Sequence, residues 1–238
     1  MRAERVGGLE AVVAGGTDRQ GGGQGPAIVL LHGFGASGMD LVGLYRMLDV
    51  PREIRFVFPA APVVLAPGPA GYDSRCWWPL DVAALDRAVR TGRPRDLSSE
   101  HPAELAERVP MLGAALDEIE ARLEVPAGKL LLGGFSQGSM LALALALHSD
   151  RPLAGLALLS SALLAADQWV PRMASRRGLP VLQSHGTEDV LLSYPAAEIL
   201  CARMREAGMD VEFVSFRGGH EIPQRVLDSL GALARRVL

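Results

Sequence analysis

The sequence predicts an α/β fold with a mostly parallel sheet of about seven strands and helices on both faces. Two observations support this prediction. Short apolar runs such as 27–31 and 129–132 are continuous rather than alternating, as expected for strands that are buried on both faces. Segments with helical spacing or strong helix formers, such as 103–123, lie between these runs. Strands that alternate with helices favour parallel crossover connections within one sheet.

Composition limits the class of protein. A length of 238 residues suits a single domain over 1–238, and 49% hydrophobic residues argue against extensive disorder. The net charge of −3 gives no electrostatic reason to expect nucleic acid or an anionic membrane as partner. Cys76 and Cys201 are too few for a disulfide scaffold and lack the spacing of metal ligands. No signal peptide and no run of transmembrane length is found, so we expect a cytoplasmic protein without stable membrane insertion.

The N-terminal third contains three predicted strands. Residues 9–14 suit a short edge strand, and 27–31 and 54–58 suit buried strands. The glycine-rich segment 15–25 is interpreted as a hairpin turn. It does not fit a phosphate-binding loop, because no Gly-Lys-Ser/Thr follows and the next element is a strand.

The segment 62–102 is predicted to be an irregular loop followed by a short charged helix. It is rich in proline, glycine and aromatic residues, and a loop of this length is unusual unless it has a function. The following segment, 103–123, has apolar residues on one helical face, and Pro110 inside it predicts a break or a kink.

The C-terminal half repeats strand and helix. The Leu/Ala alternation at 141–147 has a strand-like period of two, but alanine and leucine favour a helix, here one that is buried on several sides. Gly208 fits the end of the helix before the last strand. The remaining predicted strands are 129–132, 153–160, 180–186 and 211–216, and the remaining predicted helices are 195–207 and 222–238.

The strand at 129–132 leads into Gly134-Phe135-Ser136-Gln137-Gly138, which is the pattern G-x-S-x-G between a strand and a helix. Such a sharp turn exposes the serine hydroxyl above the sheet edge, and only small residues two positions away let the neighbouring chain pass. A helix that begins at the serine directs its positive end to the same point. The setting favours Ser136 as a nucleophile, if a base and an acid follow.

Five histidines compete for the role of the base. His32 and His185 each stand between a strand and a glycine, where a role in backbone geometry is favoured, and His101 lies in a polar connector. His148 ends the helix that begins at Ser136, roughly 15 Å away at 1.5 Å per residue. His220 follows the last strand among glycines, at the sheet edge where open α/β sheets place their sites.

Three carboxylates are candidates for the acid that orients this histidine. Asp189 follows a strand end and precedes apolar residues, so it ranks first; Asp167 ranks second and Glu188 third. The resulting order Ser136, Asp189, His220 is that of the α/β-hydrolases. The oxyanion donors would be the backbone N–H groups of Gln137 and of Phe34, in the glycine-rich loop that follows the strand at 27–31.

The ordered motifs resemble those of the carboxylesterase/phospholipase family of α/β-hydrolases, which includes acyl-protein thioesterases and lysophospholipases. The matching segments are Leu31-His32-Gly33-Phe34-Gly35, Phe58-Pro59-Ala60-Ala61-Pro62, Trp77-Trp78, Gly134-Phe135-Ser136-Gln137-Gly138-Ser139, His185-Gly186-Thr187-Glu188-Asp189 and Gly218-Gly219-His220. The resemblance implies the same triad and the same oxyanion donors, and it implies neither a metal nor an organic cofactor. The serine distinguishes the chain from dienelactone hydrolases, which carry cysteine at this turn.

The acyl-binding region differs from what the resemblance leads us to expect. The segment 80–110 is longer and more charged, so substrate preference does not carry over. We expect 62–102 to cover the acyl site and Phe34, Trp77 and Trp78 to bind substrate, although buried indoles fill cores as often as they line pockets.

The sequence therefore predicts a serine hydrolase that cleaves small-molecule carboxylic esters or thioesters of short to medium acyl groups through an acyl-serine intermediate. Lysophospholipase, acyltransferase or peptidase activity on the same triad is an alternative. So is a catalytically idle hydrolase fold that binds a ligand or a partner. A homodimer is one oligomeric state that the sequence allows.

Overall fold

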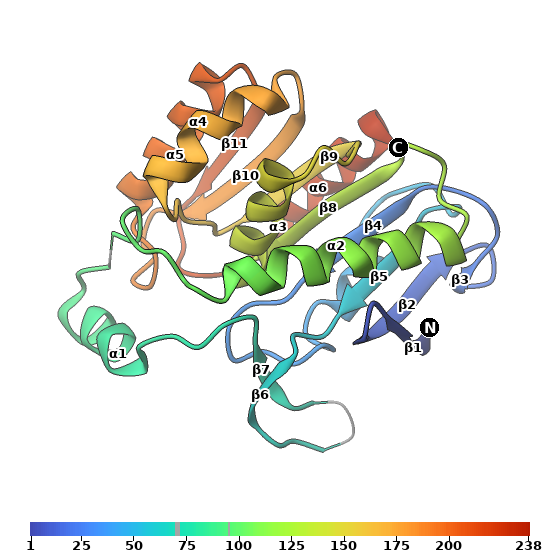
Figure 1. Cartoon of the computed structure of the whole chain (residues 1–238), viewed down its shortest axis with the longest axis horizontal. Coiled ribbons are helices and arrows are strands. Elements are labelled where there is room, and N and C mark those ends of the chain that lie inside the picture. The colour runs from blue at the N-terminus through green and yellow to red at the C-terminus, as the bar shows by residue number, and fades with distance from the viewer. Residues whose placement is uncertain (70–71, 95) are drawn as a thin grey trace.

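A central sheet organises the computed structural model, which describes residues 1–69, 72–94 and 96–238 (Figure 1). In these ranges the sheet has nine strands in the order β1-β2-β5-β4-β8-β9-β10-β11, with β3 beside β2. β2 runs antiparallel to β1 and β5, and the remaining pairs are parallel. The strands are β1 (Arg2–Val6), β2 (Leu9–Gly16), β3 (Gln20–Gly22), β4 (Ala27–Leu31), β5 (Arg55–Pro59), β8 (Leu130–Phe135), β9 (Gly155–Leu159), β10 (Pro180–Gly186) and β11 (Asp210–Phe216).

Helices cover both faces of this sheet, as the sequence predicts. Four helices pack on one face and share a hydrophobic cluster: α2 (Leu105–Arg122), α3 (Gln137–His148), α4 (Ala166–Met173) and α5 (Tyr194–Glu206). The opposite face carries α6 (Gln224–Val237) and the short 3-10 helix η1 (Val42–Arg46), and a second 3-10 helix, η2 (Ala174–Arg176), follows α4. The alternation of strand residues between the two clusters explains the continuous apolar runs. In β4, Val29 joins the first cluster, whereas Ile28 and Leu30 join the second.

The helix α3 is buried on all sides. Every residue from 137 to 147 is buried, which accounts for the uncharged Leu/Ala repeat. The predicted helix is therefore confirmed, and the residues that alternate with a period of two do not form a strand. The predicted end of α5 is also confirmed, since Gly208 follows the C-cap with a left-handed φ of +85°.

Two expectations about the elements are wrong, and a third is wrong in part. The sheet has nine strands rather than about seven, because β1 and β3 were not expected. β1 is a polar, charged strand, and β3 contains two glycines, so neither has an apolar pattern. The segment 9–14 is not at the edge, since β1 pairs outside β2. The predicted break at Pro110 is absent, because the helix α2 continues through this residue. Proline lacks an N–H and so removes one helical hydrogen bond there, while the turns on either side keep theirs.

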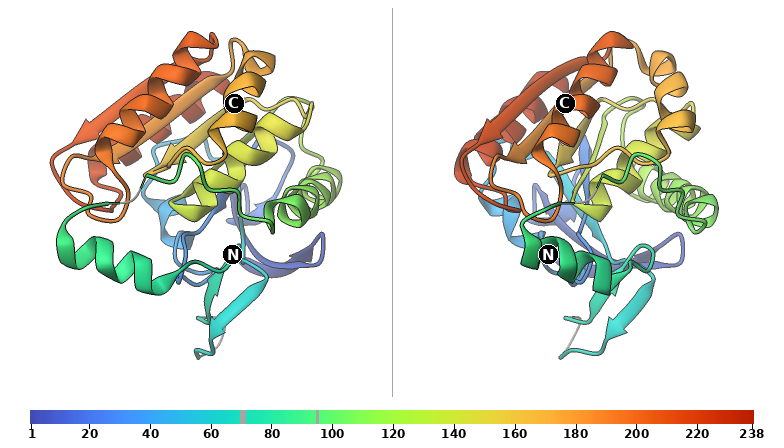
Figure 2. Two further views of the ribbon diagram at one scale, coloured as in Figure 1. Left: turned by 60° about the vertical axis from the view of Figure 1, so that its left-hand side comes forward. Right: turned by 90° about the vertical axis from the view of Figure 1, so that its left-hand side faces the viewer.

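The predicted irregular segment 62–102 has more structure than expected. It contains an antiparallel hairpin of β6 (Val63–Ala66) and β7 (Ser74–Cys76), and then α1 (Val82–Thr91). Asp81 caps the start of α1 and the left-handed Gly92 ends it. Figure 2 shows the hairpin extending away from the sheet and α1 lying apart from it. Ala70, Gly71 and Arg95, which belong to this segment, lie outside the described residues.

Within the described ranges, we find no helix that is both long enough and apolar enough to cross a membrane.

Candidate active site

Ser136 occupies the sharp turn between β8 and α3. Its φ of +54° and ψ of −121° lie in a region that side chains rarely adopt, and its N–H donates to the Leu159 carbonyl at 2.8 Å. The backbone is thus strained at Ser136 and anchored to the neighbouring strand β9. The turn leaves the side chain half-buried at the end of the sheet.

The two glycines of the turn are required by close backbone contacts. A Cβ on Gly138 would lie 2.2 Å from the Leu31 carbonyl oxygen. A Cβ on Gly134 would lie 2.6 Å from the Gly138 carbonyl carbon and 2.7 Å from the same Leu31 oxygen. The predicted need for small residues two positions on either side of the serine is therefore confirmed.

Asp189 and His220 are brought together from two loops. Nδ1 of His220 lies 2.7 Å from Oδ2 of Asp189, whose side chain is completely buried. The other carboxylate oxygen, Oδ1, accepts the N–H groups of Leu191 and Leu192 at 2.8 and 2.9 Å. Burial alone would raise the pKa of Asp189, but the hydrogen bond and charge of His220 and these two amides lower it. The carboxylate is therefore held ionised.

The carboxylates ranked second and third lie elsewhere. Asp167 is exposed and pairs with His101, at 3.2 Å between Oδ1 and Nε2. Glu188 is exposed and accepts from Arg217 at 3.0 Å. Neither contacts His220, although both follow strands in the sequence. The structure thus brings Asp189, and not its competitors, to the histidine.

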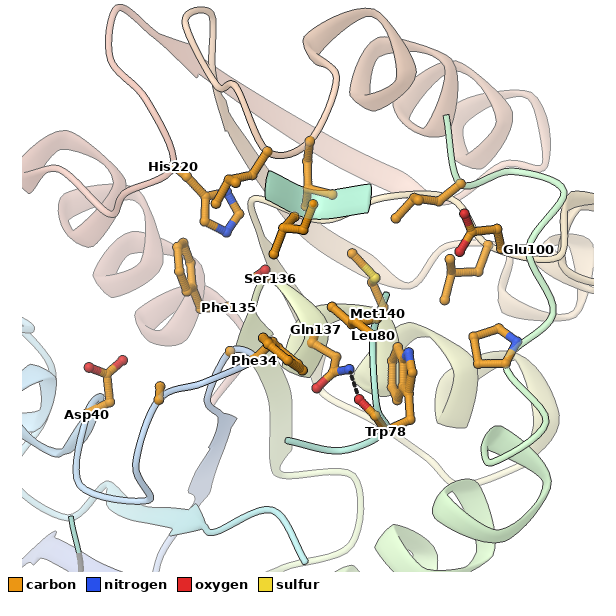
Figure 3. Close-up of a pocket in the computed structure, with 18 residues that line it drawn as sticks. Phe34, Asp40, Trp78, Leu80, Glu100, Phe135, Ser136, Gln137, Met140 and His220 are labelled. Atoms are coloured by element: carbon orange, nitrogen blue, oxygen red, sulfur yellow. Dashed lines mark hydrogen bonds between the residues drawn. The ribbon is translucent and has the colours of Figure 1, made fainter. Parts of the chain in front are cut away.

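A cavity of about 160 Å³ opens between Ser136 and His220. Figure 3 shows the His220 ring turned toward the serine hydroxyl, with Phe34 and Gln137 close by. The wall is mostly apolar, and Asp40 and Glu100 lie at opposite ends of it (Figure 3). Burial raises the pKa of Asp40. The remaining wall residues are Gly33, Ala36, Trp78, Leu80, Leu85, Leu97, Pro102, Phe135, Met140, Leu164, Leu191 and Leu192.

Two backbone amides are free to bind an anion in this cavity. The residues Phe34 and Gln137 both line it, and in the described part of the chain neither N–H donates to a backbone carbonyl. Gln137 is the first residue of α3, where N–H groups have no partner within the helix. The pair can therefore stabilise negative charge on an oxygen bound beside Ser136.

The two adjacent tryptophans have different positions. Trp78 lines the cavity, whereas Trp77 is fully buried behind it and does not line it. The Gln137 side chain holds both: Oε1 accepts the Trp77 N–H at 2.8 Å, and Nε2 donates to the Trp78 carbonyl at 2.7 Å. The position of Trp77 therefore does not fit the substrate-binding role expected of it.

Several wall residues were not predicted. Met140 lies one helical turn after Ser136, so helical spacing could have placed it on the same face. Leu164, Leu191 and Leu192 reach the cavity from loops, and no pattern in the sequence indicates this. His185 is completely buried behind the acid, with Nε2 3.0 Å from the Leu192 carbonyl oxygen and 3.4 Å from Oδ2 of Asp189.

The described residues contain no group of three or more His, Cys, Asp or Glu side chains that could hold a metal ion. The geometry offers instead a strained serine, a carboxylate-bound imidazole and two free amides around one apolar cavity. This arrangement can perform nucleophilic acyl transfer.

The model of the phospholipase/carboxylesterase family matches residues 17–234. The chain belongs to the phospholipase/carboxylesterase family. It has the α/β-hydrolase fold of that family, in a nine-stranded variant within the described ranges.

The similarity to known proteins covers most of this chain. Acyl-protein thioesterase 1 of Neurospora crassa is 26% identical over 210 residues, which cover 85% of this chain and 83% of that protein. Carboxylesterase SOBER1 of Arabidopsis thaliana is 29% identical over 222 residues, covering 89% and 90%. The crystal structure of esterase PE8 has a TM-score of 0.76 and 28% identity, and the match covers 95% of this chain and 97% of that one.

Proposed function

We propose that this family member hydrolyses carboxylic esters or thioesters through an acyl-serine intermediate. The Ser136 hydroxyl attacks the substrate carbonyl, and Nε2 of His220 accepts its proton. Asp189 keeps the proton on Nδ1 and stabilises the imidazolium. The N–H groups of Phe34 and Gln137 bind the oxyanion. The imidazolium then protonates the leaving alcohol or thiol, and a water activated by the same histidine releases the acid.

One observation carries most of this proposal. His220, which contacts the buried Asp189 at 2.7 Å, lines the same apolar cavity as Ser136, whose φ is +54°. A purely structural ion pair needs neither the strained serine nor the free amides. The names of the related thioesterase and carboxylesterase fit the same chemistry.

We propose acyl groups of short to medium length as substrates. The cavity volume of about 160 Å³ and its apolar wall suit a chain of a few methylene groups better than a long lipid tail. The segment 62–102 contributes Trp78, Leu80, Leu85 and Leu97 to this wall, so it is proposed to cover the acyl group. The homodimer and the cytoplasmic location stay predictions of the sequence.

A fluorophosphonate probe tests the nucleophile. It should label the wild-type chain at Ser136, whereas S136A should not be labelled. Ser175 is exposed and far along the chain on η2, so S175A is the matched control and should be labelled like the wild type. Absence of label on the wild type, under conditions that label a known serine esterase, contradicts the proposal.

A series of p-nitrophenyl esters tests the substrate class. Values of kcat/KM should rise over short acyl chains and fall sharply for long ones. A maximum at long chains would instead support a lysophospholipase. Product analysis with an added alcohol separates hydrolysis from acyl transfer, because only a transferase diverts most of the acyl group from water.

A further inference from the structure

His32 is a buried histidine with both ring nitrogens engaged. His32 is only 2% exposed, and it directly precedes the loop that carries Phe34. Nε2 lies 2.9 Å from the Ala61 amide nitrogen, and Nδ1 lies 2.9 Å from the Gly33 carbonyl oxygen. The proposed triad does not use this side chain.

These two contacts determine the tautomer. The Ala61 N–H can only donate, so Nε2 of His32 must be the unprotonated nitrogen. Nδ1 then carries the proton and donates it to the Gly33 carbonyl. Burial lowers the pKa of His32 to about 4, so the ring is neutral near pH 7 and keeps this arrangement.

The Gly33 carbonyl and the Phe34 N–H belong to the same peptide group. A trans peptide is planar, and its C=O and N–H point in opposite directions. The Gly33 oxygen accepts the Ala36 N–H at 3.3 Å in addition to the His32 ring. Two donors therefore hold the oxygen edge of this peptide group, and the Phe34 N–H points away from the opposite edge. We propose that His32 is a positioning residue that aims the Phe34 N–H at the oxyanion, an inference that rests on the proposed function.

The same loop is tied to the second oxyanion donor. The indole N–H of Trp77 donates to the His32 carbonyl at 2.9 Å, and the Trp77 backbone N–H donates to the Gln137 side chain. The ring centroids of His32 and Trp77 are 5.6 Å apart. A hydrogen-bonded path thus runs from the Phe34 loop through Trp77 to Gln137. Trp77 is in this way a further support of the oxyanion site, and not a wall of the cavity.

A misdirected Phe34 N–H should affect the chemical step and not substrate binding, because the full negative charge on oxygen develops only in the transition state. Loss of one oxyanion donor lowers kcat by roughly 10²- to 10³-fold in other hydrolases. Loss of the group that aims the donor should have a smaller effect, since the amide itself remains. We expect a decrease in kcat of about 10- to 100-fold with little change in KM.

Three variants separate positioning from packing. H32N places an amide NH₂ close to the position of Nδ1 and can still donate to Gly33. H32Q places its polar group near Nε2 instead, and H32L has no polar group. For each variant we would measure kcat and KM with p-nitrophenyl butyrate, and inhibition by a butyl trifluoromethyl ketone, whose serine adduct carries the oxyanion. Active sites are titrated with fluorophosphonate, and thermal unfolding checks that each variant is folded at the assay temperature.

H32L and H32Q should lose about 10- to 100-fold in kcat and a similar factor in affinity for the ketone, whereas KM changes less than about threefold. H32N should retain most of both. A folded H32L with unchanged kcat and ketone affinity per titrated site overturns the inference, even if its Tm is lower. If H32L does not fold, equal kcat values for H32N and H32Q overturn it. Failure of the proposed function would appear separately, as a wild-type chain that is neither labelled nor active.

Discussion

Nδ1 of His220 lies 2.7 Å from Oδ2 of Asp189, while the other oxygen of the same carboxylate accepts two backbone N–H groups. The carboxylate is therefore fixed by the chain on one side and is left with one oxygen for the imidazole. This relationship determines which ring nitrogen carries the proton, and it leaves Nε2 for the serine.

Replacing the acid should abolish most of the activity without unfolding the chain. In D189N the amide can donate to Nδ1 of His220, so the imidazole keeps its place but takes the wrong tautomer, with its proton on Nε2. We expect kcat to fall by roughly 10³- to 10⁴-fold with a small change in KM. D167N and E188Q are matched controls, because these carboxylates are exposed and pair with other residues. A control variant with the same loss would refute the assignment of Asp189.

The two tryptophans should respond differently to substitution. Trp78 lines the cavity, so W78L should enlarge it and move the optimum of the p-nitrophenyl ester series to longer acyl chains. Trp77 lies outside the cavity and donates to the His32 carbonyl, so W77F should lower kcat and Tm but leave the chain-length optimum in place. The assay is kcat/KM against acyl length for both variants. A shifted optimum in W77F would contradict this division.

The turn around Ser136 should not tolerate a side chain at Gly138. A Cβ there would lie 2.2 Å from the Leu31 carbonyl oxygen, so G138A must displace β4 or α3. We expect a loss of about 1–3 kcal/mol in the free energy of unfolding, together with a loss of activity. A Cβ on Gly113, inside α2, would point into open space among the described residues, so G113A is the control and should stabilise the helix by about 0.5–1 kcal/mol. Urea denaturation measures both.

The stability of the fold should depend on His32 at acid pH. Its pKa is lowered from 6.5 to about 4 in the folded chain, mainly by burial. The folded state therefore prefers the neutral ring. The contribution of His32 to the free energy of unfolding is complete above about pH 6.5 and decreases as the pH falls toward 4. The contribution of His32 to the free energy of unfolding should decrease by roughly 2–3 kcal/mol between pH 8 and pH 4.5.

The pKa of His185 is also lowered from 6.5, so this residue acts in the same direction over the same pH range, whereas the lowered pKa of Asp189 acts only below its ordinary value of 3.8. The wild type is therefore compared with H32N by urea denaturation at both pH values. The variant should lose less stability on acidification than the wild type does. Equal losses would show that His32 does not contribute to the pH dependence.

Much of this protein follows from local patterns in the sequence. Continuous apolar runs predict strands that are buried on both faces, and the α3 helix follows from its leucines and alanines even though they alternate. The G-x-S-x-G pattern predicts the strained serine, because its two glycines are needed where the backbone of the neighbouring strand passes close to the turn. Residues that follow parallel strands converge at one edge of the sheet, which is why Asp189 and His220 could be paired from the sequence alone.

Other features depend on contacts between distant segments. The polar strand β1 forms because β2 offers it a backbone ladder, and its own side chains do not indicate a strand. Trp77 and Trp78 take different positions, and both are held by the side-chain amide of Gln137, which is 60 residues away from Trp77. The tautomer of His32 depends on the Ala61 amide, which no local pattern relates to the ring. The sequence by itself thus determined the strained turn at Ser136. The tertiary structure decided which side chains hold the loop that carries Phe34, because packing chooses hydrogen-bond partners that are far apart in the chain.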